Sequence, residues 1–297
     1  MKKPGNLIGL TLLLLSALSW GPAYLFIKLA VADIPPLTIA LLRVVSASLI
    51  FYCICVFQKQ SLSKWNHLWK KMAVIGFLLI ATPFTLISWG ERYIPSSVAG
   101  LLVSLALIVT VILAHFYGKQ ERLTRNKMLG ICAGIIGLCF IYLPTISHET
   151  IQNQIGILLV VLASCSIGSG TVYARTHLQK VPVTVALTMQ LMISALILLP
   201  LSLLIDRPFS LPAPSAVSLL SVLALTVIST VLAYYFYYKN IQLSGATYAS
   251  FALIIIPIFA LMCGAIFLHE QLTWNIYLGS VFILAGIGAV NPVFNRK

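Results

Sequence analysis

Charged residues are scarce in this sequence, and acidic residues are the scarcest of them. Aspartate and glutamate together occur six times in 297 residues, against 19 lysines and arginines. Charged residues make up 8% of the chain, whereas about 25% is usual in a soluble domain. With 60% hydrophobic residues and a mean hydropathy of +1.02, the composition excludes a soluble globular domain and indicates an integral membrane protein.

Motifs of hydrolytic, phosphate or metal chemistry are also missing from the sequence. There is no Gly-x-Ser-x-Gly, no His-Glu-x-x-His and no phosphate-binding loop. The six cysteines fall within apolar runs and lack the paired spacing of a zinc site. The formal net charge is +13, but no basic patch is interleaved with stacking aromatic residues. We therefore predict no enzymatic activity, no metal, no cofactor and no nucleic-acid partner.

Long apolar runs dominate the chain instead. A membrane-spanning helix needs about 20 apolar residues, and ten runs approach this length. The predicted spans are 7–28, 37–57, 72–91, 96–117, 127–145, 155–175, 183–205, 215–238, 244–268 and 274–293. Short connections rich in proline and polar residues separate them. The predicted fold class is an all-α integral membrane protein with ten transmembrane helices, which has the lipid bilayer as a partner.

The basic residues predict the orientation of the spans. With the N terminus inside, fifteen of them fall on the cytoplasmic side, while Lys28, Arg92 and Arg207 fall outside and Arg43 lies within a span. Basic residues accumulate on the cytoplasmic side of membrane proteins. We predict a multi-pass protein of the cell inner (plasma) membrane with both termini cytoplasmic.

The sequence repeats itself once. Glu121-Arg122-Leu123-Thr124 returns 149 residues later as Glu270-Gln271-Leu272-Thr273. The same offset pairs Gly130 with Gly279 and Gly137 with Gly286. The chain is therefore predicted to be a tandem duplication of five-helix units, residues 1–147 and 148–297. Because five is odd, the second unit must enter the membrane from the opposite face, which predicts inverted repeats with a substrate site between them near mid-membrane.

The repeated tetrapeptide allows two interpretations. Its glutamate could couple transport to protons, or the turn could cap a helix. Thr124 and Thr273 directly precede apolar runs, where a hydroxyl can bond to free backbone N–H groups. A carboxylate at a membrane boundary also lacks the desolvation typical of a functional intramembrane acid. We therefore interpret the turns as structural.

Arg43 is the charged residue that lies clearly within a predicted span. An unpaired cation at a helix centre costs about 2.5 kcal/mol or more, so the guanidinium needs a partner, a wet cavity or access to the interface. Two interpretations remain open. Arg43 either snorkels or contacts helix-end carbonyls, or it binds an anionic group of a substrate.

Polar and aromatic residues form stripes on several predicted spans. In the first span, Ser16, Trp20 and Tyr24 follow helical spacing, and Gly21-Pro22 interrupts the helix. A proline in a membrane helix frees a carbonyl, which is tolerated only against protein or a water-filled cavity. The predicted substrate-binding residues are Trp20, Tyr24, Arg43, Thr85, Trp89, Ser166, Tyr173, Tyr234 and Ser250. The alternative for each stripe is helix packing or an interfacial aromatic belt.

Several of these segments together carry a family resemblance. They are Ser19-Trp20-Gly21-Pro22 through Lys28, the two Glu-x-Leu-Thr turns, and Gly245-Ala246-Thr247-Tyr248-Ala249-Ser250 followed by Pro257. In their order, spacing and duplication they resemble the EamA family of the drug/metabolite transporter superfamily, over nearly the whole chain. The resemblance implies a ten-helix transporter of amino acids or other small metabolites, with a central cavity lined mainly by spans 1, 3, 4, 6, 8 and 9.

The expected function is therefore secondary transport of a small-molecule substrate, without ATP, by alternating access. One alternative is an importer or exchanger of a nucleotide-like or sulfonium metabolite such as S-adenosylmethionine. Another, from a different class, is a non-transporting membrane scaffold subunit. The scarcity of intramembrane carboxylates favours facilitative or exchange-driven transport over strictly proton-driven transport. The sequence leaves the oligomeric state unknown.

Overall fold

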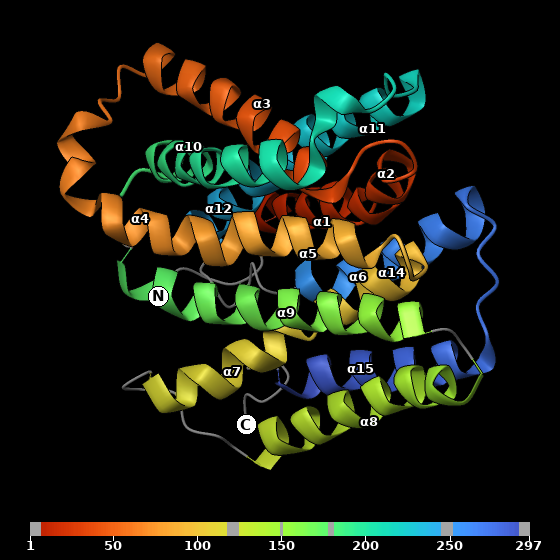
Figure 1. The fold of residues 1–297 in the computed structure, drawn as a ribbon. Helices are drawn as coiled ribbons and strands as arrows, with labels where there is room; N and C mark the ends of the chain where they lie inside the picture. The colour runs from red at the N-terminus through yellow and green to blue at the C-terminus, as the bar shows by residue number, and fades with distance from the viewer. Residues whose placement is uncertain (1–6, 118–124, 149–150, 178–180, 245–251, 291–297) are drawn as a thin grey trace.

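The computed structural model describes residues 7–117, 125–148, 151–177, 181–244 and 252–290. These residues form helices joined by short turns, and no strand occurs among them (Figure 1). The all-helical membrane fold is thereby confirmed for the described part of the chain.

The helices of the first sequence half, up to residue 148, follow closely on one another. They are α1 (Leu7–Trp20), α2 (Ala23–Ala30), α3 (Pro36–Phe57), the 3-10 helix η1 (Ser63–Leu68), α4 (Trp69–Gly76), the π-helix η2 (Phe77–Ala81), α5 (Thr82–Gly90), α6 (Ser96–Val103), α7 (Ala106–Tyr117) and α8 (Arg125–His148).

The second sequence half has a similar series. It contains α9 (Ile151–His177), α10 (Val183–Leu201), the π-helix η3 (Ser202–Asp206), the 3-10 helix η4 (Pro208–Ser210), α11 (Ala216–Thr226), the π-helix η5 (Val227–Leu232), α12 (Ala233–Ser244), α14 (Ala252–Phe267) and α15 (Trp274–Val290).

Within the described residues, seven helical stretches, two of which include a short turn, are long and apolar enough to cross a membrane. They are Leu7–Ala30, Pro36–Phe57, Ser63–Gly90, Ser96–Leu113, Ile151–Ala174, Val183–Ser210 and Ala216–Asn240. Shorter apolar helices occupy Met128–Phe140, Ile255–Phe267 and Trp274–Gly286. Each of the ten predicted spans overlaps one of these segments. Many large apolar side chains point outward, among them Leu196, Leu204, Leu220 and Val281. Such a surface suits contact with lipid.

Helices of the first sequence half pack mainly against helices of the second half. The main pairs are α3 with α10, α5 with α9, α8 with α15, α1 with α12, and α6 with α14. In Figure 1, α8 and α15 lie at one edge, α3 and α10 near the opposite edge, and α5 and α9 between them. Each of these pairs joins an early helix to a late one, so the core is built between the two halves of the sequence.

The glycines of α8 and α15 bring these two helices into close contact. A Cβ atom on Gly137 would lie 2.6 Å from the carbonyl oxygen of Gly279, and one on Gly286 would lie 2.5 Å from that of Gly130. Since early residues of one helix meet late residues of the other, the helices run antiparallel. Small residues allow such close approach in membranes, as the repeated glycines suggested.

Two membrane helices are broken by short turns. The first breaks at Gly21-Pro22, between α1 and α2, as the sequence predicts. The fourth breaks between α6 and α7, where the backbone N–H groups of Ser104 and Leu105 bond to carbonyls three residues earlier, at 3.2 and 3.1 Å. Neither glycine nor proline occurs at this second break, so the sequence did not predict it.

Three carboxylates cap helices of the opposite sequence half. Glu270 accepts hydrogen bonds from the backbone N–H groups of Ser96 and Ser97, at 2.7 and 3.1 Å, and from both hydroxyls, at the start of α6. Asp206 accepts from the N–H and hydroxyl of Thr38, at 2.7 and 2.9 Å, in the first turn of α3.

Asp33 makes the third cap, at the start of α11. It accepts from the N–H and hydroxyl of Ser215 and from the hydroxyl of Ser218. These donors hold the pKa of Asp33 below its usual value, because they stabilise the ionised carboxylate.

The prediction of a structural role for the Glu-x-Leu-Thr turn is confirmed for Glu270, but the capping group differs from the expected one. Thr273 precedes α15 and accepts N–H bonds from Ile276 and Tyr277 through its carbonyl oxygen. Among the described residues, its hydroxyl makes no capping bond; Glu270 is the capping side chain, and it caps α6. Glu121 and Thr124 lie outside the described residues.

Replacing Gly137 with valine tests the contact between α8 and α15. The added side chain meets the backbone of α15 and forces the helices apart, so we expect a loss of about 1–3 kcal/mol in stability, seen as a lower unfolding temperature in detergent micelles. Cys139→Val is the matched control, since Cys139 is exposed on the same helix. Equal stability of the two variants would contradict the tight contact.

Replacing Asp33 with asparagine tests the cap on α11. The folded-state pKa of Asp33 lies below the usual 3.8, so its ionised form stabilises the fold above that pH, and this stabilisation disappears as the pH falls through the lowered pKa. We expect Asp33→Asn to unfold at a lower temperature than wild type at neutral pH. The difference should shrink below about pH 4. A difference that does not depend on pH would argue against an ionic cap.

Candidate functional site

The interruption of the first membrane helix lies in a cluster of aromatic side chains. Trp20, the last residue of α1, makes edge contacts with Tyr234 and Tyr237 of α12, with ring centroids 5.4 and 5.0 Å apart. Tyr234 stacks against Tyr238 at 6.3 Å. We call Trp20, Tyr234, Tyr237 and Tyr238 the aromatic cluster. It joins the break predicted from Gly21-Pro22 to a helix more than 200 residues later in the chain.

Arg43 lies beside this cluster and is only 5% exposed. Its Nε donates a 2.7 Å hydrogen bond to Thr230 Oγ1, and its Nη2 donates a 3.2 Å bond to the carbonyl of Ser229. The guanidinium carbon lies 3.7 Å from the ring centroid of Phe84, a cation–π contact. Arg43 thus has structural partners in η5 and α5, although the carbonyl that it contacts lies within η5 rather than at a helix end as expected.

The same guanidinium retains donor capacity. It carries five N–H donors, and the bonds to Thr230 and Ser229 use only Nε and Nη2. No carboxylate pairs with Arg43 among the described residues. Tyr24 and Tyr234 are close enough to act electrostatically on it. A buried cation beside phenols and an indole suits the carboxylate or other anionic group of a small ligand.

Two π-helical segments border the site. η2 lies in the helical stretch Ser63–Gly90 and η5 in the stretch Ala216–Asn240, and a π segment weakens the regular backbone ladder. Side chains satisfy the carbonyls near both of them. Ser166 donates to the carbonyl of Leu78 at 2.8 Å, and Ser229 to the carbonyl of Ser19, also at 2.8 Å. The second bond ties the end of α1 to η5 and so holds the break next to Arg43.

The predicted site residues do not all converge. Trp20, Arg43 and Tyr234 meet as described, and Tyr24 acts electrostatically on Arg43 while packing on Gly100 of α6. Ser166 is a backbone-bonding residue of α9 instead.

The remaining predicted residues lie elsewhere. Trp89 is half-buried near the end of α5. Tyr173 stacks on His177 within α9, with centroids 4.3 Å apart. Ser250 lies outside the described residues.

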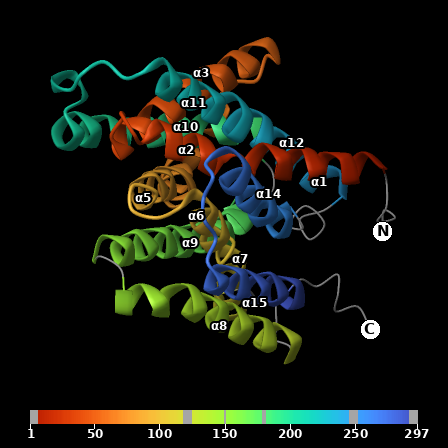
Figure 2. The same cartoon turned by 90° about the vertical axis from the view of Figure 1, so that its right-hand side faces the viewer.

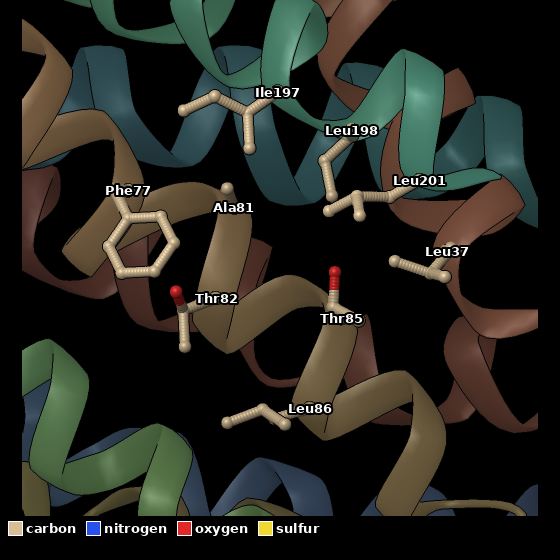
Figure 3. Close-up of a pocket in the computed structure, with 9 residues that line it drawn as sticks. All are labelled: Leu37, Phe77, Ala81, Thr82, Thr85, Leu86, Ile197, Leu198 and Leu201. Atoms are coloured by element: carbon tan, nitrogen blue, oxygen red, sulfur yellow. The ribbon is translucent and has the colours of Figure 1, made fainter. Parts of the chain in front are cut away.

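Thr85 belongs to a separate apolar cavity of about 180 Å³ between α3, α5 and α10. Figure 3 shows its hydroxyl pointing into the space bordered by Leu37, Leu198 and Leu201. The Oγ1 atom is buried and lacks a hydrogen-bond partner within the described part of the chain. Thr85 is the predicted site residue that lines this cavity, so the structure does not join it to the aromatic cluster.

Glu91 was missed by the sequence analysis, which took it as the end of a span. It follows α5 directly, is 0% exposed, and neither of its carboxylate oxygens has a hydrogen-bond partner in the described structure. Lys28 donates to the main-chain carbonyls of Glu91 and Ile94, at 2.6 and 2.9 Å.

The sequence repeat contains a signal that could have drawn attention to Glu91. An offset of 149 residues pairs Glu91 with Asn240, whose side-chain amide is also fully buried and has no partner among the described residues.

A family model matches the chain twice. The EamA-like transporter family model covers residues 7–143 and 154–291. The chain belongs to the EamA-like transporter family. The resemblance seen in the sequence is thereby confirmed.

Relatives of this EamA-like chain are named as transporters. An uncharacterized transporter of Archaeoglobus fulgidus is 31% identical over 278 residues, covering 93% of this chain and 95% of the relative. The uncharacterized transporter YoaV of Bacillus subtilis is 26% identical over 284 residues, covering 94% and 95%. A protein of Escherichia coli named "Probable amino-acid metabolite efflux pump" is 24% identical over 284 residues, covering 93% and 92%.

A crystal structure shares the fold of this EamA-like chain. The match covers 98% of this chain and 97% of the chain in that crystal structure, with a TM-score of 0.67 and 17% sequence identity. The comparison supports the arrangement of helices and carries no information on substrate.

Removal of the Thr230 hydroxyl tests the coupling to Arg43. Thr230→Val leaves a buried, charged N–H without its 2.7 Å acceptor, so we expect a loss of about 1–3 kcal/mol in equilibrium unfolding in micelles. Thr226→Val is the matched control, because the Thr226 hydroxyl only bonds back to Val222 of its own helix. In an Arg43→Met background, Thr230→Val should cost much less. Additive losses would exclude the coupling.

Proposed function

We propose that this EamA-like protein is a secondary transporter of small metabolites, most plausibly amino acids or related compounds, working by alternating access. The observation that carries the proposal is the buried guanidinium of Arg43 beside the aromatic cluster, at the break in the first membrane helix. Arg43 offers a cation with unused donors, and the rings offer apolar faces and hydroxyls. A ligand with a carboxylate and a compact organic body fits this combination.

Amino acids match the site in two respects. Their carboxylate suits the remaining Arg43 donors, which favour planar, bidentate recognition. Their ammonium group, or an aromatic side chain, suits the face of Trp20. The names of the E. coli and Salmonella typhimurium relatives, both "Probable amino-acid metabolite efflux pump", support the same class and an outward direction.

We further propose the architecture of ten crossings in two inverted repeats, residues 1–147 and 148–297, around a central substrate site. The two close contacts between α8 and α15 are Gly137 with Gly279 and Gly286 with Gly130. If each glycine is replaced by its repeat counterpart, Gly130 by Gly279 and Gly137 by Gly286, the first contact becomes the second. This is the pattern that a two-fold axis perpendicular to antiparallel helices produces. The two matches of one family model to the chain also support a duplication.

We propose the inner membrane as the location, with both termini in the cytoplasm. Figure 2 shows the start of α1 and the end of α15 directed to the same side of the molecule, which supports a common side for the termini. The distribution of basic residues along the sequence supports the cytoplasm as that side.

Flux measurements on purified protein in proteoliposomes test the function. We expect saturable exchange of at least one radiolabelled compound in a panel of the proteinogenic amino acids. Trp20→Ala should lower this flux about tenfold or more, because it removes an aromatic wall of the site. Trp274→Ala is the matched control, since that indole is 68% exposed. Its flux should equal that of wild type.

Other outcomes distinguish the alternatives. Flux of S-adenosylmethionine without amino-acid flux would favour transport of sulfonium metabolites. An absence of flux across both sets would contradict transport and favour a scaffold subunit.

A further inference from the structure

Glu91 stands apart from the other acidic residues that the structure describes. Asp33, Asp206 and Glu270 each accept hydrogen bonds from a backbone N–H and at least one hydroxyl at a helix start. Glu91 is more buried than any of these three, at 0% exposure, and neither of its carboxylate oxygens receives a bond from the described residues. An ionised carboxylate without donors is strongly disfavoured in such surroundings, while a protonated one is tolerated.

Among the described residues, the titratable groups that act on Glu91 come from three neighbouring elements. Lys28 and Tyr24 face it from α2, Arg43 from α3, and Glu270 from the turn before α15. The helix α9 packs on the end of α5 and brings Gly156 and Val160 against Gly90.

The Lys28 ammonium group lies close to Glu91 but already has other hydrogen-bond acceptors. The Lys28 ammonium donates to two main-chain carbonyls rather than to the carboxylate. Glu91 lies just beyond the span Ser63–Gly90. Burial raises the pKa of its carboxyl group, the positive charge of Lys28 lowers this pKa, and the nearby Glu270 carboxylate raises it further.

We propose that Glu91 is a proton-binding site which couples each transport cycle to the movement of one proton. The inference rests on the proposed transport function and adds its coupling ion. In the conformation seen here the carboxyl group is closed off and holds its proton. When water reaches it, the O–H bond breaks, the proton passes to water and the carboxylate remains.

Two structural links connect this group to the rest of the transport cycle. Arg43 is one of the charged groups that act on Glu91, so a ligand anion bound at Arg43 changes the field at the carboxyl group. Glu270, which also acts on Glu91, clamps the start of α6 across the two sequence halves. The proposed cycle requires a movement at this contact that admits water to the end of α5, where Glu91 can then ionise.

The proposal revises an expectation from the sequence. Facilitative or exchange-driven transport was favoured because intramembrane carboxylates are scarce. Glu91, directly after the span Ser63–Gly90, adds a fully buried carboxyl group that this argument did not consider. A single carboxyl group is sufficient to carry one proton.

Infrared spectroscopy on the purified protein in lipid nanodiscs tests the site without any substrate. We expect wild type at pH 7 to show the C=O stretching band of a protonated carboxylic acid. This band should vanish in Glu91→Gln, which keeps the side-chain shape but cannot titrate. Asp33→Asn, the matched control, removes an ionised carboxylate and should leave the band in place. A band that is absent from wild type, or that is unchanged in Glu91→Gln, would overturn the proposal.

Accumulation in proteoliposomes tests the coupling. With a mixture of radiolabelled amino acids as probe, we expect a pH difference of one unit to drive wild-type accumulation of about tenfold. In Glu91→Gln, the remaining flux should be insensitive to the pH difference. Continued pH-driven accumulation by this variant would refute the coupling. No amino-acid flux in wild type would contradict the proposed function, while the infrared result would still decide whether Glu91 holds a proton.

Discussion

The fold depends on one constraint: a backbone N–H or C=O group inside a membrane protein must find its partner within the protein, because the hydrocarbon offers none. Helices satisfy this constraint along their length but not at their ends. Asp33, Asp206 and Glu270 supply the missing acceptors at three helix starts, and each reaches a helix of the other sequence half. A chain with only six acidic residues thus uses half of them to join its two halves.

The same constraint shapes the candidate site. The break at Gly21-Pro22 and the π segments η2 and η5 disturb the regular backbone ladder, and polar side chains compensate for the disturbance. Arg43 takes part in this compensation by donating to Ser229 and Thr230 of η5. Its structural role and a binding role are therefore compatible, because the bonds that hold the guanidinium in place leave other donors unused. The aromatic cluster then lies beside a cation that is already fixed in orientation.

Glu91 illustrates how surroundings rather than residue type decide the chemistry of an acid. Glu270 and Glu91 are both glutamates near helix ends, yet four donors meet Glu270 and none meets Glu91. The first is suited to cap a helix start, and the second to bind and release a proton. Their electrostatic interaction places the proposed proton site next to a contact that joins the two halves.

The sequence by itself determined the helical membrane class, the positions of the apolar segments, the break at Gly21-Pro22 and the family, because these follow from local composition, proline chemistry and repeated motifs. It also placed Trp20, Arg43 and Tyr234 among the site candidates. Only the tertiary structure showed that Glu270 caps α6, that the fourth membrane helix breaks at Ser104, that Thr85 lines a separate cavity and that Glu91 is buried without donors. These features depend on which distant groups meet, and neither hydropathy nor spacing along one chain specifies such partners.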